Sequence, residues 1–401
     1  MYGPRGMQVA AALRELPALG WQPTVVCLAP RRGGPHWRSG DDREPVPGVE
    51  YRRVASPQDW WIVRSARRIV PALRDRPDPA RLWVSPATRA AVDAARNNRY
   101  GALITFAQPW SDHLVGLRVQ RATGLPWVAH FSDPWAASPY ATAAQRARWR
   151  PMEAEVIRCA TSVVFVTAEA ADSTMAAYPD EWRRKAAIVP HGYDPRSTPP
   201  SGGTGSRARL RLVYTGRFYS GIRTPLSLLH ALATVTSEDR FREAFDVVFV
   251  GPYVEEYRDA ARSLGVETSV TFGARVPPSE AAAQAAAADV LLVIDAPGDG
   301  PSVFLPSKLV DYLAFRKPIL GITPARGASA ALLRRLGGPV VAPDDVDAIA
   351  AALRDLATRW RAGTLGVAPE FDRVAAEYDI RCTARRLSDV LVRACAETSR
   401  P

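Results

Sequence analysis

Ser307, Lys308 and Asp311 are the residues whose types and spacing best suit a phosphorylated ligand. We expect Ser307 to cap a helix, which would leave free backbone N–H groups for an anion. Asp311 comes four residues later, on the same face of that helix. An ionised carboxylate accepts two hydrogen bonds, as the two hydroxyls of a ribose require. The spacing alone leaves an alternative equally open, namely a surface lysine and aspartate that bind no ligand.

A strand–loop–helix–strand unit is expected to position these three residues. Residues 290–294 form an apolar run of strand length, and a Gly/Pro loop follows it. Residues 306–315 have helical spacing, and residues 319–322 form a second apolar run. Two strands joined through a helix imply a parallel sheet. Ligands of such sheets bind beyond the carboxyl ends of the strands, so we expect the three residues to lie there.

Arg217 ends another expected strand, residues 211–217, and Arg223 lies between this strand and a helix expected over residues 226–235. Two guanidinium groups at the end of a strand can hold a diphosphate through forked hydrogen bonds. Their position after a Gly turn favours phosphate binding over two solvated arginines.

His130 and Asp133 lie at the end of the expected strand 127–131 and could hydrogen-bond a sugar or transfer a proton. His113 and His191 are rival histidines at a helix start and at another strand end. Asp299 lies close to another aspartate in a loop, which is not a metal site by itself. Neither a Ser-His-Asp arrangement nor a metal-ligand spacing emerges from the sequence, and we expect no metal.

The composition restricts the class of protein. A length of 401 residues is typical of two or three domains. The four cysteines are far apart and form no CxxC pair, which indicates reduced, structural thiols. No apolar run approaches the ~20 residues of a membrane span, and we find no signal peptide. We therefore expect a cytoplasmic location.

The net charge of +11 is concentrated in residues 1–200. A basic half is compatible with an anionic membrane surface, a phosphorylated lipid or a nucleic acid. It is equally compatible with an arginine-rich composition that serves solubility. Residues 60–76 are basic and aromatic and could form a helix lying on a membrane, although an ordinary domain helix with an arginine face is favoured.

Two series of alternating strands and helices flank a linker rich in Pro, Gly and Ser, residues 196–209. We therefore expect an amino-terminal Rossmann-like domain over 1–195 and a carboxy-terminal one over 210–370. Residues 371–401 are expected to form helices that pack back toward the first domain.

The amino terminus departs from this pattern. Residues 1–6 form a Gly/Pro loop that leads into a helix over 7–19 and a strand over 24–29. A doubly wound domain normally begins with a strand that precedes such a loop. We therefore expect a first strand that the sequence lacks, and an upstream in-frame run of about eight apolar residues would account for it.

Several of these segments together resemble the retaining glycosyltransferases of family four. The segments are GPRG, SDHLVGL, GLPWVAHFSDPW, VPHGYDP, TGRFYSGIR and PSKLVDYLAFRKPIL. Each match is modest, but their order and spacing are specific, and together they cover nearly the whole chain. The resemblance implies the GT-B fold, in which two Rossmann-like βαβ domains of an α/β protein face each other across a cleft.

The resemblance also implies roles for individual residues. The donor would be a nucleotide sugar of the UDP or GDP type, bound without a metal or other cofactor. Residues implied in donor binding are Gly3, Gly6, Gly216, Arg217, Arg223, Ser307, Lys308, Leu309 and Asp311. Residues implied in catalysis are His130, Asp133, Arg217 and Arg223, and those implied in contact with the acceptor or sugar are Arg5, His113 and Asp299.

Three departures from the family pattern stand out. Val303 occupies the position of the family's first glutamate, so the sequence does not show which group supports the transferring sugar. Asp311 replaces the second glutamate, and Arg223 replaces a lysine one position earlier. The last two replacements preserve charge, so donor binding is expected to persist.

The resemblance predicts transfer of a sugar, with retention, to a cell-surface polysaccharide, glycolipid or lipid-linked glycan, at the inner face of the cell membrane and without a nucleic acid partner. One alternative is a catalytically silent subunit that binds a sugar nucleotide. Another is an epimerase or a phosphorylase of the same fold. A phosphorylase would need a lysine for pyridoxal phosphate, and Lys185, Lys308 and Lys317 are poor candidates.

Overall fold

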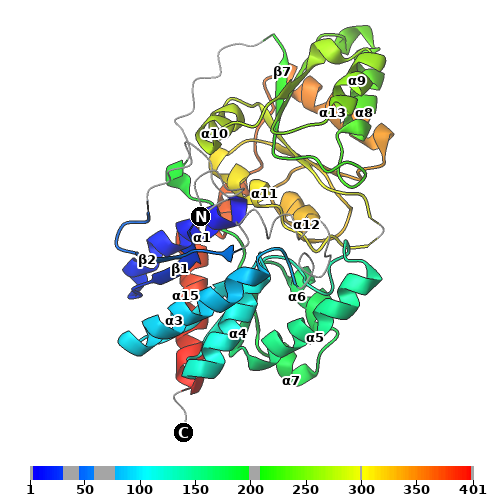
Figure 1. Ribbon diagram of the computed structural model, residues 1–401. Coiled ribbons are helices and arrows are strands. Elements are labelled where there is room, and N and C mark those ends of the chain that lie inside the picture. The colour runs from blue at the N-terminus through cyan, green and yellow to red at the C-terminus, as the bar shows by residue number, and fades with distance from the viewer. Residues whose placement is uncertain (1–2, 30–44, 58–76, 198–207, 299, 399–401) are drawn as a thin grey trace. The chain divides into compact units, whose positions relative to one another are not determined.

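The computed structural model describes residues 3–29, 45–57, 77–197, 208–298 and 300–398. The chain divides into two compact units, which are described separately. Unit 1 combines residues 1–192 with residues 380–401, and unit 2 comprises residues 193–379. Figure 1 shows that the last helix, drawn in red, lies beside the first, drawn in blue, within unit 1.

The described residues of unit 1 form two parallel sheets with helices beside them. One sheet pairs β1 (Thr24–Leu28) with β2 (Glu50–Val54), and the other has the order β3 (Leu103–Phe106), β4 (Trp127–Phe131), β5 (Ser162–Phe165) and β6 (Ala186–Ile188). The helices are α1 (Gly3–Glu15), α3 (Val84–Asn97), α4 (Ser111–Thr123), α5 (Ala143–Cys159), α6 (Ala168–Met175), α7 (Asp180–Arg183) and α15 (Ile380–Thr398).

Unit 2 contains one sheet of six parallel strands. Its order is β12 (Val340–Val341), β11 (Ile319–Ile322), β10 (Val290–Ile294), β7 (Leu210–Thr215), β8 (Phe245–Val250) and β9 (Val270–Gly273). The helices are α8 (Leu226–Thr236), α9 (Glu255–Ser263), α10 (Pro278–Ala286), α11 (Ser307–Tyr312), α12 (Ala328–Arg335), α13 (Val346–Arg361) and α14 (Phe371–Ala376). The expected α/β class with parallel sheets is confirmed.

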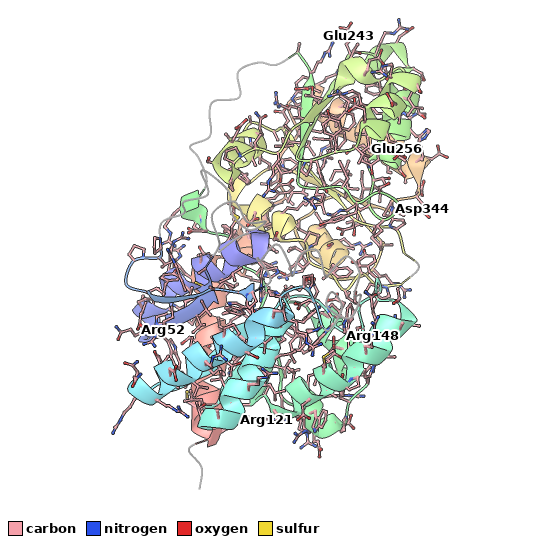
Figure 2. All side chains as sticks on the ribbon, in the orientation of Figure 1. Arg52, Arg121, Arg148, Glu243, Glu256 and Asp344 are labelled. Atoms are coloured by element: carbon pink, nitrogen blue, oxygen red, sulfur yellow. The ribbon has the colours of Figure 1, made fainter. Side chains whose placement is uncertain are left out.

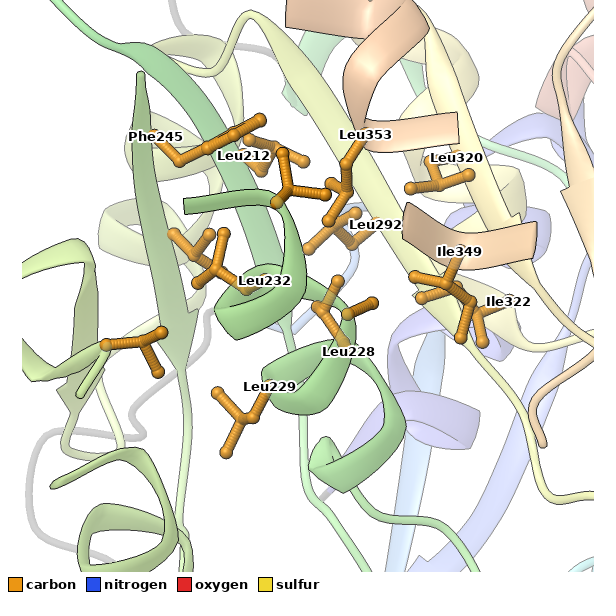
Figure 3. Packing of buried hydrophobic residues seen from close by; sticks show 14 of the residues in the cluster. Leu212, Leu228, Leu229, Leu232, Phe245, Leu292, Leu320, Ile322, Ile349 and Leu353 are labelled. Carbon is orange, nitrogen blue, oxygen red and sulfur yellow. The ribbon is translucent and has the colours of Figure 1, made fainter. Parts of the chain in front are cut away.

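The core of unit 2 lies between the sheet and two helices that cover one of its faces. Leu228 and Leu232 of α8 and Leu353 of α13 pack onto Leu212 and Leu292 of the two central strands (Figure 3). All five side chains are fully buried or nearly so. Strands of a parallel sheet are covered on both faces, which is why β10 is a continuous apolar run. This core fixes the ends of β7 and β10.

Leu292→Ala is expected to lower the free energy of unfolding of unit 2 by about 2–5 kcal/mol, because it leaves a cavity beneath α8 and α13. Chemical denaturation followed by circular dichroism measures the change. Val254→Ala is the matched control, since Val254 is 43% exposed and should change stability by less than about 0.5 kcal/mol. Equal effects of the two substitutions would contradict this assignment of the core.

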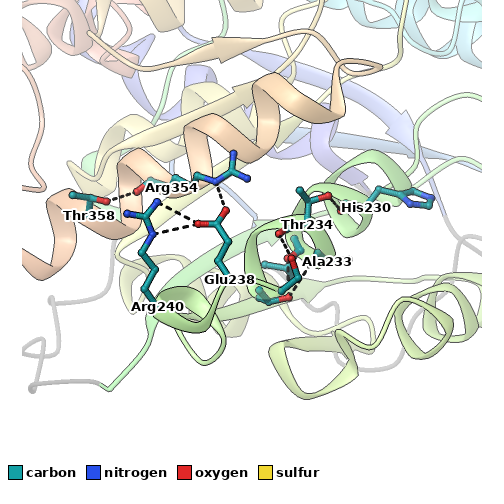
Figure 4. A network of polar contacts seen from close by, with 10 residues as sticks. His230, Ala233, Thr234, Glu238, Arg240, Arg354 and Thr358 are labelled. Atoms are coloured by element: carbon teal, nitrogen blue, oxygen red, sulfur yellow. Dashed lines mark hydrogen bonds and ion pairs between the residues drawn. The ribbon is translucent and has the colours of Figure 1, made fainter.

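Charged side chains lie on the outside of both units, as the labelled residues of Figure 2 show. One cluster joins separate elements of unit 2. Glu238, after α8, accepts hydrogen bonds from Arg354 of α13 at 2.6 Å and from Arg240 at 3.2 Å (Figure 4). Arg354 is the main cause that holds the pKa of Glu238 below its usual value. The cluster links the two helices that cover the core.

The Pro-, Gly- and charge-rich residues 31–59 favour a loop or a small hairpin, an expectation that the structure corrects in part. β2 lies in this region and pairs with β1 in parallel, whereas a hairpin would make the two strands antiparallel. Residues 60–76 and most of the expected linker lie outside the described residues. Among the described residues, no helix is both long and apolar enough to cross a membrane.

Candidate functional site

The topology of unit 2 marks one edge of its sheet as the place for a ligand. From β7, the chain adds β8 and β9 on one side and β10, β11 and β12 on the other. The order therefore reverses between β7 and β10, and ligands of open parallel sheets bind beyond the carboxyl ends of such strands. The loop 216–223 follows β7, and Asp295 follows β10. The residues of unit 2 predicted from the sequence to bind the sugar donor lie on this loop and on α11, the next helix after β10. They therefore belong to this edge.

Lys308 is the most unusual group of this edge. Its Nζ lies 3.6 Å from the centroid of the Tyr214 ring. It is buried and has no hydrogen-bond partner among the described residues. Burial lowers the pKa of Lys308 well below its usual value, and the charge of Arg223 lowers it further. A buried ammonium group with free donors is a site prepared for an anion.

Arg223 is held near Lys308 by a tight loop. Its backbone exchanges two hydrogen bonds with Tyr219, of 2.8 and 2.9 Å. Its Nη2 donates to the carbonyl of Arg217 at 2.9 Å, while its buried Nε has no partner among the described residues. The Arg217 side chain is exposed. Arg223 therefore offers a hydrogen-bond donor held in place by the loop, and Arg217 an exposed one that solvent reaches.

Two glycines allow close packing at this edge. Gly216, after β7, lies against Lys308, and Gly251, after β8, lies against Gly216. Gly216 has φ 131° and Gly251 has φ 146°, values that side chains of L-residues rarely adopt. A Cβ atom on Gly216 would lie 2.7 Å from Lys308 Nζ, and one on Gly251 would overlap the Gly216 carbonyl. The Gly216 N–H already donates to Val250 at 2.8 Å. The absence of a side chain at Gly216 therefore leaves room for the Lys308 ammonium group, and the Gly216 N–H is not free to donate to a ligand.

Asp295 is a member of this edge that the sequence analysis left without a role. It is 7% exposed and accepts a hydrogen bond of 2.9 Å from Thr323 Oγ1. Burial raises the pKa of Asp295, while Thr323, Ser329, Arg223 and Lys308 act in the opposite direction. In the sequence, its position as the first polar residue after the apolar run 290–294 could have indicated that it belongs to the site. It places one negative charge near the two cations.

Two expectations for α11 are corrected. Pro306, not Ser307, is the N-cap of α11, and no side chain caps this helix. Leu309 is fully buried, and its backbone N–H donates to the Pro306 carbonyl. Neither the side chain nor the N–H of Leu309 is therefore free for a ligand. Asp311 is exposed as a residue, but partial burial of its carboxyl group raises the pKa of Asp311 to about 7.

Tyr312 joins α11 to the end of β7. Its hydroxyl accepts a hydrogen bond of 2.8 Å from the backbone N–H of Thr215 and lies 3.1 Å from the Thr215 hydroxyl. Tyr312 is buried, so this tie is shielded from water. The contact fixes α11, and with it Lys308 and Asp311, against the strand that precedes Gly216.

Unit 1 has a second group of candidate residues, at the ends of β3 and β4. Arg5 of α1 donates from Nη2 to His130 Nδ1 at 2.9 Å. An arginine can only donate, so Nδ1 accepts and the proton of a neutral His130 ring is on Nε2. Burial lowers the pKa of His130 well below its usual value, and Arg5 lowers it further. His130 is therefore a neutral hydrogen-bond donor.

Asp133 lies on the loop after β4, and Glu153 of α5 anchors this loop. Asp133 accepts a hydrogen bond of 3.4 Å from Gln108. Glu153 is fully buried and accepts hydrogen bonds of 2.7 Å from the Ala136 N–H and of 2.7 Å from the Tyr178 hydroxyl. Burial raises the pKa of Asp133.

His113 is a core residue, which corrects the expectation that it contacts a ligand. It has no exposed surface, and its ring lies 4.4 Å from that of Phe131, centroid to centroid. Its Nδ1 shares a hydrogen bond of 2.8 Å with the Thr105 hydroxyl, which also accepts one from Trp127. Burial lowers the pKa of His113 to about 3. Sequence spacing could not separate this residue from His130.

His113 should make the stability of unit 1 sensitive to acid. Its pKa is about 3 when folded and about 6.5 when unfolded, so stability falls as the pH drops below 6.5. Between pH 7 and pH 5 this residue should cost about 2 kcal/mol. His113→Phe, which keeps the aromatic contacts, should lose that much less over the same interval. Denaturation at both pH values, followed by tryptophan fluorescence, measures the difference, and an unchanged pH dependence would contradict it.

Gly3 and Gly6 lie within the first turns of α1, so the expected glycine loop is helical there. A cavity of about 30 Å³ beside Arg5 is also lined by His130, His191 and α15, and its size suits one or two waters. Asp299 lies outside the described residues. Among the described residues, no three His, Cys, Asp or Glu side chains are grouped as a metal site requires.

Residues 209–359, which include the whole edge described in unit 2, match the family described as glycosyl transferases group 1. No protein of curated function matches the chain. The match covers the two cations, Gly216, Asp295 and α11, so the family comparison and the geometry point to the same part of the molecule.

Solved structures share the fold over both units. The sucrose-phosphate synthase of Thermosynechococcus elongatus superimposes with a TM-score of 0.69 at 18% identity, over 98% of this chain and 94% of that one. WaaG, a glycosyltransferase involved in lipopolysaccharide biosynthesis, gives a TM-score of 0.61 at 15% identity, over 98% and 96%. A glycosyltransferase of Rickettsia africae gives 0.63 at 11% identity, over 98% and 95%. The fold is GT-B, as expected, and the family match over residues 209–359 supports glycosyl transfer.

Proposed function

We propose that this chain is a glycosyltransferase that takes its sugar from a nucleotide-sugar donor bound at the edge of unit 2. The observation that carries the proposal is the buried, unpartnered ammonium of Lys308 beside Arg223, at the carboxyl ends of β7 and β10. A diphosphate would satisfy both cations at once. That this edge lies within the matched residues 209–359 supports the same conclusion.

The donor would bind through its diphosphate and its ribose. Lys308 and Arg223 would contact the phosphate oxygens beyond the end of β7. The exposed side chain of Arg217 would turn toward the same diphosphate and contact it. The carboxyl group of Asp311, when ionised, would accept hydrogen bonds from the two ribose hydroxyls. The hydrogen bonds between Tyr312 and Thr215 would hold α11, and with it Lys308 and Asp311, in place against β7.

Catalysis would consist mainly of stabilising the leaving group. As the bond between the sugar and the diphosphate breaks, negative charge grows on the phosphate oxygens, and Lys308 and Arg223 would interact with it most strongly in the transition state. With retention of configuration, the leaving diphosphate would help to remove the proton of the acceptor hydroxyl. In unit 1, His130, oriented by Arg5, would donate from Nε2 to a sugar or acceptor hydroxyl, and Asp133 would also contact the sugar or acceptor.

The acceptor class follows from the resemblance at the sequence level. We propose a cell-surface polysaccharide, a glycolipid or a lipid-linked glycan, reached at the inner face of the cell membrane. The basic residues of the first half would favour an anionic surface there. A donor of the UDP or GDP type and the absence of a metal requirement belong to the same proposal.

Calorimetric titration of the full chain with UDP and with GDP tests the donor site. Binding of either nucleotide supports the proposal and selects the sugar nucleotides for a screen of donor hydrolysis by mass spectrometry. Binding without hydrolysis of any donor would favour the catalytically silent subunit. Binding of neither, in a chain whose circular dichroism shows it to be folded, would overturn the donor site.

A further inference from the structure

Asp295 is a buried carboxylate that the donor chemistry described above leaves unused. It follows β10 directly, is 7% exposed and accepts a hydrogen bond of 2.9 Å from Thr323 Oγ1. A buried carboxylate is ordinarily paired with a cation. Here Lys308 Nζ and Arg223 Nε have no partner among the described residues, so neither of these atoms bonds to Asp295. A carboxylate beside two cations that leaves these donors free is an unusual arrangement.

The strand register places Asp295 beside the loop that carries Arg223. Strand β10 pairs in parallel with β7, with Leu291 opposite Val213. Following the same register along both strands brings Asp295 level with Arg217, in the loop 216–223. Neighbouring strands lie about 4.8 Å apart. Asp295 therefore stands at the edge where the diphosphate would bind.

Helix α11 brings Lys308 to the same face of the sheet as Asp295. Alternate residues of a strand share a face, so Asp295 lies on the face of Val293, which the register places opposite Thr215. Tyr312 of α11 bonds to Thr215, so α11 lies over this face. Lys308 is four residues before Tyr312 and on the same side of the helix. Asp295 and Lys308 are therefore neighbours across the end of the sheet.

A sugar transfer changes the charge of the bound diphosphate. In a nucleotide sugar both phosphates are esterified, and each carries about one negative charge. When the bond to the sugar breaks, its electron pair stays on the terminal phosphate oxygen, which receives the proton of the acceptor hydroxyl. The second pKa of such a phosphate is about 6, so at neutral pH most of this proton passes to water. The product is then more negative than the donor.

We propose that Asp295 makes the donor site discriminate between a nucleotide sugar and the nucleoside diphosphate that remains after transfer. Its fixed carboxylate repels the product more strongly than the donor, because the product carries the larger negative charge. Its hydrogen bond goes to Thr323, so Lys308 and Arg223 keep their donors for the diphosphate. Asp295 thereby favours release of the product. The inference rests on the proposed function, since it takes the diphosphate site as given.

Asp295 also affects diphosphate binding in the opposite direction. Burial and the charge of Arg223 lower the pKa of Lys308, and Asp295 counteracts this by stabilising the ammonium form that a diphosphate needs. A nucleoside diphosphate and its terminal methyl ester share this effect, because both would bind the same ammonium group. They differ in charge, since the ester, like the donor, cannot ionise a second time at its terminal phosphate. The ratio of their two dissociation constants therefore isolates the repulsion.

Calorimetric titration of the full chain with UDP and with its terminal methyl ester tests the proposal, or with the two GDP compounds if the chain binds GDP. Asp295→Asn keeps an acceptor for Thr323 and removes the charge. We expect the Kd of the ester divided by the Kd of the diphosphate to rise at least about twofold at neutral pH. Asp295→Ser, also uncharged, should raise this ratio equally, and it serves as the test if the asparagine variant does not fold.

Asp289→Asn is the matched control. Asp289 precedes β10, at the amino-terminal edge of the sheet, and accepts a hydrogen bond of 2.9 Å from the Arg211 N–H. Asparagine keeps this acceptor and removes the same charge, so Asp289→Asn and Asp295→Asn have equal net charge. The ratio of the two dissociation constants in Asp289→Asn should equal that of the wild-type chain.

Two results would overturn the inference and leave the donor site standing. One is an unchanged ratio in a folded Asp295 variant that binds both ligands, even if both bind more weakly, because Asp295 would then serve only the structure or the ammonium of Lys308. The other is an equal rise in Asp289→Asn, which would attribute the effect to net charge. Binding of neither ligand by the wild-type chain would instead contradict the donor site itself, so the two failures are distinguishable.

Discussion

Lys308→Met is expected to weaken the binding of a nucleoside diphosphate by about 2–3 kcal/mol, roughly 30- to 150-fold in Kd. Nζ is buried, lacks a partner among the described residues and lies 3.6 Å from the Tyr214 ring centroid. Methionine keeps the apolar part of the side chain, so it removes the charge and the donors without opening a large cavity. Calorimetry with UDP or GDP, whichever the wild-type chain binds, measures the loss.

Lys317→Met is the matched control, because Lys317 precedes β11 and therefore lies at the opposite, amino-terminal edge of the sheet. It should leave the Kd unchanged within about twofold. The lowered pKa of Lys308 adds a second readout. A bound phosphate stabilises the ammonium form, so binding should take up a proton at alkaline pH, and Lys308→Met should abolish this uptake. Titration in buffers of different ionisation enthalpy measures it. Undiminished affinity in Lys308→Met would refute the assigned site.

Gly251→Ala should have the second large effect, on both stability and nucleotide binding. The residue has φ 146°, and its Cβ would overlap the carbonyl of Gly216. The strained backbone and the contact together should cost about 3 kcal/mol or more. Relief of the contact would move Gly216 away from Lys308, so nucleotide affinity should fall at least tenfold in the molecules that stay folded. Denaturation and calorimetry on the same preparation separate the two effects.

Gly265→Ala provides the comparison for Gly251→Ala. Gly265 also has a positive φ, 69°, but a Cβ there would have no neighbour within 4 Å. It should lose only about 1 kcal/mol from backbone strain and keep its nucleotide affinity. If the two variants behaved alike, the close approach of Gly251 to Gly216 would not matter to the site.

The sequence predicted the elements of unit 2 best where apolar runs were continuous. Val290–Ile294 and Ile319–Ile322 are strands at the predicted residues. A strand of a parallel sheet is buried on both faces, and its sequence therefore carries an uninterrupted signal. The same reasoning predicted parallel sheets and Arg223 and Lys308 at the carboxyl ends of strands. Short-range pattern was sufficient for these features.

The tertiary structure decided what the surroundings of each side chain are. Ser307 and Pro306 both stand at the start of a helix, and only the backbone shows that Pro306 is the N-cap. His113 lies at the start of a helix and His130 near the end of a strand, and only packing shows that His113 is in the core. The parallel pairing of β2 with β1 joins residues far apart in sequence, which local pattern does not encode.

The chemical character of the site likewise came from contacts between distant segments. Lys308 is an ordinary lysine in the sequence, and its lowered pKa arises because α11 brings it against Tyr214 and Arg223 of another segment. Asp295 became part of the site because Thr323 and β10 bury it near the same cations. Residue types and spacing determined the fold class and which groups could bind a phosphate. Burial and long-range proximity, which no local pattern specifies, decided which of those groups are prepared to do so.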